Sequence, residues 1–173
     1  DTLVKKVRSG DPSNVEAQAA RIYWESYLSN ARFYRDPNAD DVVNGLLNYG
    51  YTILRGRVLT RIVAAGLSPT LSLFHRNRSN IFALADDLVE PFRPVIDCIV
   101  LELLDAGATG VERAEKARLA AVLDEMGESS QITVRTSLER LCQSFALYVE
   151  GERESLHVPV WDVSSAVAGA EDG

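Results

Sequence analysis

The segment DDVVNGLLNYGYTILRGRVLTRIVAAG, residues 40–66, carries the pattern that decides the fold. Its apolar residues recur at steps of three and four, which is the spacing of one face of an α-helix. They are Val43, Leu46, Leu47, Ile53, Leu54, Val58, Ile62 and Val63. Gly66 is placed to end the helix, because glycine readily adopts the left-handed conformation of a helix C-terminus. The sequence therefore predicts one long helix over about residues 40–65.

The same helical period covers most of the remaining chain, and there is hardly any strand signal. The further helical segments are about 13–33, 83–105, 111–126 and 134–150. Pro91 and Pro94 fall early in the segment 83–105, where proline is tolerated in a first turn and otherwise bends the axis. We predict an all-α fold, a single helical domain of about five to eight helices over residues 1–163, with a disordered tail over 164–173.

Composition favours one compact domain that does not cross a membrane. The chain has 173 residues, 46% of them hydrophobic, which is enough for one good core. Its apolar runs are far shorter than the ~18 residues of a membrane-spanning helix. Cys98 and Cys142 lie in apolar helical surroundings without CxxC spacing. We expect both to be reduced core residues of a soluble, cytoplasmic protein.

The charge of the chain is unevenly distributed. The net charge is −7, but residues 1–95 sum to +2 and residues 96–173 to −9. Contacts with phosphate are therefore expected from the first half, and the second half predicts a solvated face or one that meets a basic partner. On the long helix, Arg55, Arg57 and Arg61 are most simply a solvated stripe.

Four polar residues are candidates for chemistry: Glu16, His75, Asp87 and Glu90. Asp87 and Glu90 are three residues apart, so on a helix they project from one face. His75, in the preceding connector, could meet them there. Oxygen ligands with a single nitrogen suit Mg²⁺ or Mn²⁺, whereas a structural zinc site favours more sulfur or nitrogen.

Each candidate also has a simpler interpretation, and spacing alone leaves the choice open. Ser13 and Glu16 fit a capping box, in which Glu16 reaches back to the helix N-terminus. Asp87 and Glu90 lie early in a helix, where the macrodipole stabilises acidic side chains by about 0.3–1 kcal/mol each. A histidine such as His75 often caps or packs without binding a metal.

Four ordered strings are more specific than these single residues. They are SGDPSNVEAQAARIYW at 9–24, DVVNGLLNYGY at 41–51 followed by AAGLSP at 64–69, LFHRN at 73–77, and DLVEPFRP at 87–94. In this order they resemble the CRISPR-associated integrase and endonuclease family of spacer acquisition, most like its type II branch.

The resemblance implies a metal-dependent site. The metal ligands and catalytic residues of the family fall on Glu16, His75 and Glu90, with Asp87 as a supporting acidic residue. The implied cofactor is Mg²⁺ or Mn²⁺, which would assist in-line attack of a 3′-hydroxyl or of water on a phosphodiester.

The resemblance also implies DNA as the partner, both as a foreign fragment and as the CRISPR repeat. Arg76, Arg78 and Arg93 flank the ligands and are the expected phosphate contacts, although Arg93 could equally pair with Glu90 and hold it in place. Further implied partners are the small second adaptation protein of the CRISPR system and a second copy of the chain.

One family feature has no counterpart in this sequence. The family has an N-terminal β-sandwich domain that mediates much of its dimerisation, and the chain resembles the C-terminal helical domain alone. The alternative hypothesis is therefore a non-catalytic helical module that serves assembly or DNA docking.

Overall fold

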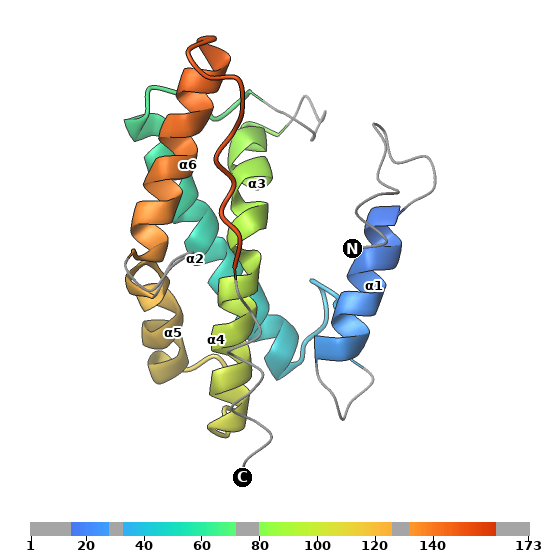
Figure 1. Ribbon diagram of the computed structural model, residues 1–173. Coiled ribbons are helices and arrows are strands. Elements are labelled where there is room, and N and C mark those ends of the chain that lie inside the picture. The colour runs from blue at the N-terminus through green and yellow to red at the C-terminus, as the bar shows by residue number, and fades with distance from the viewer. Residues whose placement is uncertain (1–14, 28–32, 72–79, 126–131, 162–173) are drawn as a thin grey trace. The chain divides into compact units, whose positions relative to one another are not determined.

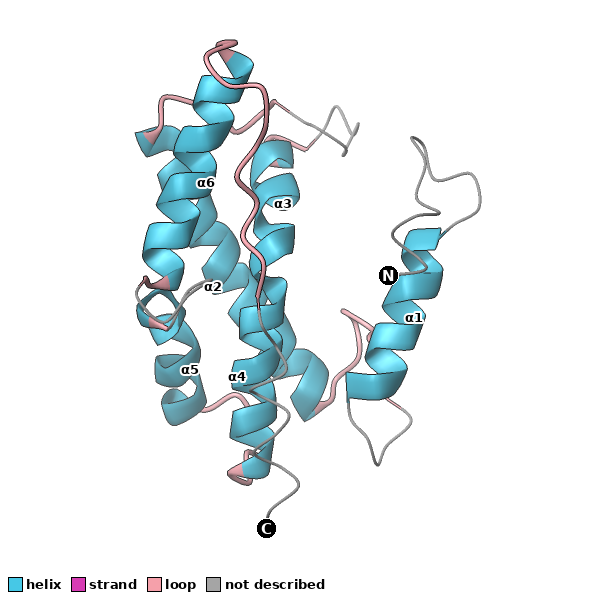
Figure 2. Cartoon of the chain, in the orientation of Figure 1, coloured by secondary structure: helices cyan, strands magenta, loops and turns pink. Residues whose placement is uncertain are grey.

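The computed structural model describes residues 15–27, 33–71, 80–125 and 132–161, without the side chains of Glu16 and Ser26. Within these ranges the secondary structure is helical, with no strand (Figures 1 and 2). The elements are α1 (Val15–Tyr27), α2 (Val42–Ala64), α3 (Ala83–Val89), η2 (Glu90–Phe92), α4 (Arg93–Asp105), α5 (Arg113–Ala120), η3 (Ala121–Asp124) and α6 (Val134–Val149). The predicted all-α fold is confirmed, and the predicted tail over 164–173 lies outside the described residues.

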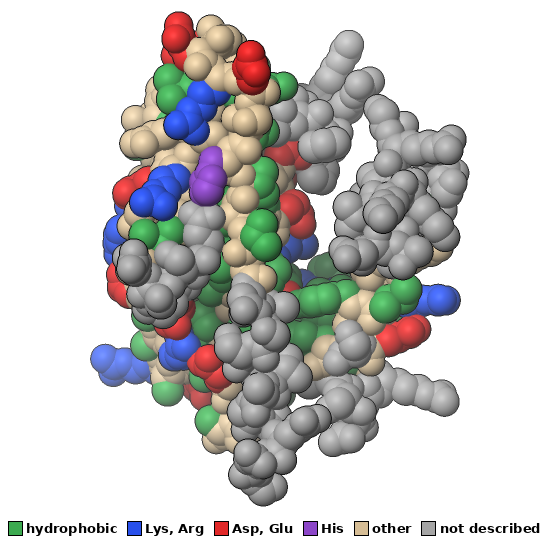
Figure 3. Space-filling model, in the orientation of Figure 1, with side chains coloured by type: hydrophobic (Ala, Val, Ile, Leu, Met, Phe, Trp, Pro, Cys, Tyr) green, Lys and Arg blue, Asp and Glu red, His purple; other side chains and the backbone are tan. Residues whose placement is uncertain are grey.

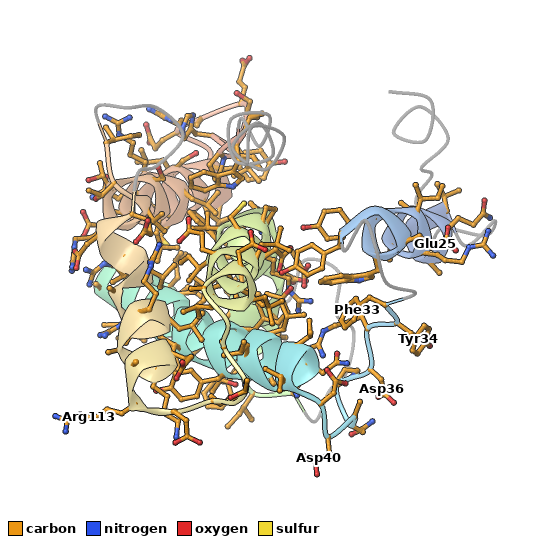
Figure 4. The ribbon with its side chains drawn as sticks, turned by 90° about the horizontal axis from the view of Figure 1, so that it is seen from below. Glu25, Phe33, Tyr34, Asp36, Asp40 and Arg113 are labelled. Carbon is orange, nitrogen blue, oxygen red and sulfur yellow. The ribbon has the colours of Figure 1, made fainter. Side chains whose placement is uncertain are left out.

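The chain divides into two compact units, residues 1–39 and residues 40–173. In the first unit, α1 carries an aromatic cluster in which the Trp24 ring lies 5.1 Å from Tyr27 and 5.6 Å from Phe33, centroid to centroid. Phe33 belongs to this cluster, whereas the neighbouring Tyr34 is 79% exposed (Figure 4). Aromatic contacts therefore hold Phe33 close to α1.

Helix α2 is the centre of the second unit, in contact with α3, α4, α5 and α6. Its buried residues are Asn44, Leu46, Leu47, Gly50, Leu54, Val58 and Ile62. The long helix predicted over 40–65 is thus confirmed, although Val63, expected on the apolar face, is 60% exposed. The burial of a full face of α2 makes it the element around which the other helices pack.

Both ends of α2 are formed by local hydrogen bonds. At the start, Asp41 Oδ1 accepts from the Asn44 backbone at 2.9 Å, and the Asn44 amide donates to Asp41 Oδ2 at 2.7 Å. At the end, Gly66 has a φ of 75°, and its N–H and that of Leu67 donate back to Val63 and Ile62. This is the glycine C-terminus that the sequence predicted.

The two prolines divide the third predicted helix. The segment 83–105 forms α3, the 3₁₀ turn η2 and α4 in succession, with Pro91 in the turn and Pro94 in the first turn of α4. Proline lacks the N–H of a helical hydrogen bond and crowds the preceding turn, which explains the change of helix type. The segment 111–126 likewise forms α5 followed by η3.

Both cysteines are free thiols, as predicted. Cys142 is buried, and burial raises the pKa of its thiol to about 11. Burial, and then the nearby Asp97 carboxylate, raise the pKa of Cys98, which is only half-buried. Both thiols are therefore protonated near neutral pH. No helix among the described ranges combines the length and the apolar character needed to cross a bilayer.

Gly50 allows α2 to approach its neighbours closely, and its replacement tests this packing. A Cβ at Gly50 would lie 2.5 Å from Ile96 Cγ2 and 3.1 Å from Leu119 Cδ2. Gly50→Ala should destabilise the fold by about 1–3 kcal/mol, because overpacking exceeds the helix-propensity gain of about 1 kcal/mol. Gly56→Ala is the matched control, since a Cβ there meets nothing within 4 Å. Gly56→Ala should raise the free energy of unfolding measured in urea. Equal effects of the two changes would contradict the packing argument.

Candidate functional site

The junction of α3, η2 and α4 carries the predicted site residues that the structure describes. The backbone stays helical through the junction, with φ −75° and ψ −29° at Val89 and φ −53° and ψ −46° at Glu90. Asp87 and Glu90, three residues apart, therefore lie on one face, as the sequence indicated. Asp87 is half-buried, and the Glu90 side chain is 50% exposed.

Arg93 lies against Glu90. Its Nη2 is 2.9 Å from Glu90 Oε1, and both side chains are about half exposed. The guanidinium also stacks on the Tyr51 ring, 4.9 Å from the ring centroid. Of the two roles expected for Arg93, the structure contains the ion pair that holds Glu90. An exposed pair of this kind contributes only about 0–1 kcal/mol to stability, so its effect is on the position of the carboxylate.

A buried acid anchors Tyr51. The Tyr51 hydroxyl donates a hydrogen bond to Oδ1 of Asp97, which is 3% exposed. Asp97, Tyr51, Arg93 and Glu90 thus form a continuous chain of contacts from the core to the surface. In the described part of the chain, the buried Arg93 Nε has no hydrogen-bond partner. The guanidinium is therefore oriented by its contacts with Tyr51 and Glu90.

A second acid of α3 joins α2 to the connector. Arg55 donates two hydrogen bonds to Asp86, one of them 2.9 Å long, and the Asn80 amide donates to the same carboxylate at 2.6 Å. Arg61 Nε lies 3.1 Å from Glu139 Oε1, at ion-pair distance but without hydrogen-bond geometry. The predicted solvated stripe is therefore wrong for Arg55 and Arg61, because each pairs with an acid on a neighbouring helix.

The C-terminal strap, defined as residues 151–161, reaches the same junction. It turns at Gly151, where φ is 79°, and runs back along α6 towards the start of α4 (Figure 1). The Trp161 indole donates a hydrogen bond to the Pro91 carbonyl and packs edge-on against Phe92, with centroids 5.6 Å apart. Trp161, 70 positions from Pro91 in sequence, thereby stabilises the turn that carries Glu90.

The other predicted site residues lie outside the described part of the structure. These are the side chain of Glu16 and the residues His75, Arg76 and Arg78. Among the described side chains, no group of three or more His, Cys, Asp or Glu could hold a metal ion. By type, the predicted donors, two carboxylates and one imidazole, suit a hard divalent cation.

Sequence reasoning did not identify the residues that support Glu90. No motif of the sequence links Tyr51, Asp97 or Trp161 to Glu90. Tyr51 and Asp97 are 46 positions apart, and their pairing depends on how α2 packs on α4. The one available signal was an acid, Asp97, inside an otherwise apolar helical segment, since buried acids in proteins are usually paired.

Comparison with known proteins identifies relatives. The family model described as CRISPR associated protein Cas1 matches residues 11–134. A CRISPR-associated endonuclease Cas1 of Neisseria meningitidis is 44% identical over 111 residues, which are 64% of this chain and 36% of that protein. A second, from Pyrobaculum aerophilum, is 33% identical over 135 residues, 76% of this chain and 46% of that protein. The chain thus spans between a third and a half of the length of these curated relatives.

The fold is shared with a solved structure as well. A casposase bound to integration product superposes with a TM-score of 0.72 over 96% of this chain and 58% of that one. The sequence identity is 20%, so this likeness concerns the fold alone.

The hydroxyl of Tyr51 can be tested separately from its ring. Tyr51→Phe should destabilise the fold by about 1–3 kcal/mol, because the buried Asp97 loses a hydrogen-bond donor while the ring still supports Arg93. Tyr49→Phe is the control: its ring stacks with Lys116 at 6.0 Å and is retained. Its effect should stay within about 0.5 kcal/mol. Urea unfolding of both variants makes the comparison, and equal losses would show that the Asp97 contact is unimportant.

Proposed function

The chain belongs to the Cas1 family of CRISPR-associated proteins, and from this premise we propose that it is the helical catalytic domain of a metal-dependent DNA endonuclease and integrase. The observation that carries the proposal is the extent of the family match. It covers residues 11–134 and so includes Glu16, His75 and Glu90 together. In this proposal the catalytic domain comprises residues 1–163.

The names of the relatives support this reaction class. Both relatives described above are named endonucleases. The structural neighbour, a casposase, is described as bound to an integration product. Cutting a phosphodiester with water and joining DNA with a 3′-hydroxyl are the same in-line displacement with different nucleophiles. One site can therefore serve both reactions.

Glu16, His75 and Glu90 are the proposed ligands of Mg²⁺ or Mn²⁺, with Asp87 as the supporting acid. When bound, such an ion neutralises charge on a phosphodiester and favours in-line attack by a hydroxyl or by water. The two oxygens of the Glu90 carboxylate allow an ion pair with Arg93 and coordination to coexist.

The role of Arg93 in this proposal is to position Glu90. It sits between the Glu90 carboxylate and the Tyr51 ring, and Tyr51 is fixed in turn by Asp97. A ligand whose orientation is set before the metal arrives loses less conformational freedom on binding. Arg76 and Arg78, which flank His75 in sequence, are the proposed contacts to DNA phosphates.

The proposed substrates and partners follow from the family. The attacking 3′-hydroxyl belongs to a foreign DNA fragment, and the target is the CRISPR repeat, so that the reaction is a transesterification. A homodimer and the small second adaptation protein complete the proposed assembly, which would act in the cytoplasm.

The alternative is a non-catalytic helical module for assembly or DNA docking. This alternative rests on the helical fold of the described residues alone and assigns no role to Glu90. The two functions differ in whether the chain needs its metal ligands, and this difference can be measured.

Glu90→Gln separates the two functions. The variant should lose Mn²⁺ binding and reduce cleavage of branched DNA by about 100-fold or more, because it removes a charged ligand. Asp105→Asn is the control, since it also removes one negative charge, from an exposed position at the end of α4. Metal binding by calorimetry and DNA cleavage are followed on the same samples.

Each outcome selects one function. Cleavage by the wild type and the control but not by Glu90→Gln supports the catalytic proposal. Cleavage that survives in Glu90→Gln contradicts the assignment of Glu90. Wild-type protein that binds no metal and cuts no DNA favours the assembly module.

Glu16→Ala distinguishes a metal ligand from a helix cap. If Glu16 is a ligand, DNA cleavage should be lost with little change in the free energy of unfolding. A capping residue would instead cost about 1 kcal/mol of stability and leave cleavage intact. Urea unfolding and the cleavage assay, run on one preparation, give both readings.

A further inference from the structure

A basic pocket lies between α6 and the C-terminal strap, on residues for which the proposed site has no use. It is an open cavity of about 300 Å³. Its lining residues are Arg140, Gln143, Ser144, Leu147, Arg153 and His157. The first four belong to α6 and the last two to the strap.

The fold brings these residues together for local reasons. Arg140, Ser144 and Leu147 recur at steps of four and three along α6, so they share one face of the helix. The turn at Gly151 reverses the chain, and the His157 N–H then donates to Ser144 Oγ at 2.8 Å. This hydrogen bond fixes the strap against α6 and places its side chains beside those of the helix.

Among the described residues, the lining offers hydrogen-bond donors and no carboxylate. Two guanidinium groups and an imidazole come from two different elements, with the Gln143 amide and the Ser144 hydroxyl between them. Figure 3 shows the described histidine, in purple, next to blue side chains on the face of α6. The cavity is therefore locally positive within a half of the chain whose net charge is −9.

Two other arginines of this half have identified ion-pair partners. Arg118 contacts Glu102 and Glu125 at 2.6 Å each, and Arg135 contacts Asp124 at 2.8 Å. Arg153, by contrast, has no ion pair or hydrogen bond with any residue in the described ranges, and it lines an open cavity. An arginine in this position is suited to an external anion.

We propose that this pocket binds one phosphate group of a DNA backbone. Arginines from opposite sides match the oxygens of a tetrahedral phosphate, whereas a planar carboxylate is satisfied by a single guanidinium fork. Leu147, 37% exposed, provides an apolar surface for the adjoining sugar. The choice of DNA rests on the proposed function, but the pocket shares no residue with the proposed metal site.

The surroundings limit the contact to one phosphate. Glu150, Glu152 and Glu154 are exposed and neighbour the pocket in sequence. Their carboxylates repel further phosphates near Arg153, so the pocket does not belong to a long basic track. It is therefore a single anchoring point for a duplex.

The test measures duplex binding by fluorescence anisotropy at several salt concentrations, with the whole chain. Arg140→Gln and Arg153→Gln should each weaken binding about fivefold to tenfold and lower the slope of log K against log salt by about 0.9. Arg113→Gln is the control, because Arg113 is exposed, points away from the helices and lies outside the pocket (Figure 4). It should leave both values unchanged.

A second measurement identifies the ligand at the pocket itself. The chain has two histidines, so the ring resonance of His157 can be assigned with a His157→Gln variant. Duplex DNA should shift this resonance at lower concentrations than inorganic phosphate does. A shift produced by inorganic phosphate alone would overturn the DNA assignment, as would a duplex that leaves the resonance in place.

The outcomes separate this inference from the proposed function. Glu90→Gln should keep the salt slope and the His157 shift, because the pocket is independent of the metal ligands. Wild-type cleavage together with unchanged binding by Arg140→Gln and Arg153→Gln would overturn the pocket and leave the function standing. If the wild type cuts no DNA but its binding depends on Arg140 and Arg153, the pocket is supported and the proposed function is overturned.

Discussion

The close approach of α2 and α4 at Gly50 is the constraint on which the rest of the second unit depends. Gly50 has no Cβ, and the Ile96 side chain occupies the space where one would be. The next residue on each helix forms the next contact, since Tyr51 donates to the buried Asp97. The apolar contact of Gly50 with Ile96 and the hydrogen bond of Tyr51 with Asp97 are thus adjacent along α2 and α4. Arg93 stacks on Tyr51, one turn before Asp97, so a shift of α4 against α2 would reach the guanidinium that holds the candidate ligand.

The prolines between α3 and α4 remove backbone hydrogen bonds, and the strap supplies one replacement. A proline in a helical segment disrupts the regular hydrogen bonds, and carbonyls near the break need other partners. Trp161 donates to one of them, at Pro91, and covers Phe92 with its ring. The turn that carries Glu90 is therefore held from the core by α2 and from the surface by the strap. Residues from three distant parts of the chain determine the position of one carboxylate.

The sequence predicted the helices well because their signals are local. The apolar period of α2, the glycine at its end and the prolines before α4 each act within a few residues. The same holds for Asp87 and Glu90, whose shared face follows from a spacing of three. The contacts of Tyr51, Arg55 and Trp161 could not be predicted in this way, because they depend on how separate elements meet. Arg55 illustrates the difference: its helical spacing suggested a solvated stripe, and only the position of α3 brings Asp86 to it.

The charge of a sequence segment also fails to predict the local charge of the folded surface. The sum over residues 96–173 is strongly negative, which by itself argues against contact with phosphate in that half. A sum over sequence does not describe a surface, however, because exposed charges act over a Debye length of about 10 Å at 0.1 M salt. The fold places Arg140, Arg153 and His157 around one cavity, while Glu102, Glu125 and Asp124 pair with other arginines. An anion at the pocket therefore meets a local field opposite in sign to the average. Folding, and not composition, therefore determines where the proposed DNA contact lies.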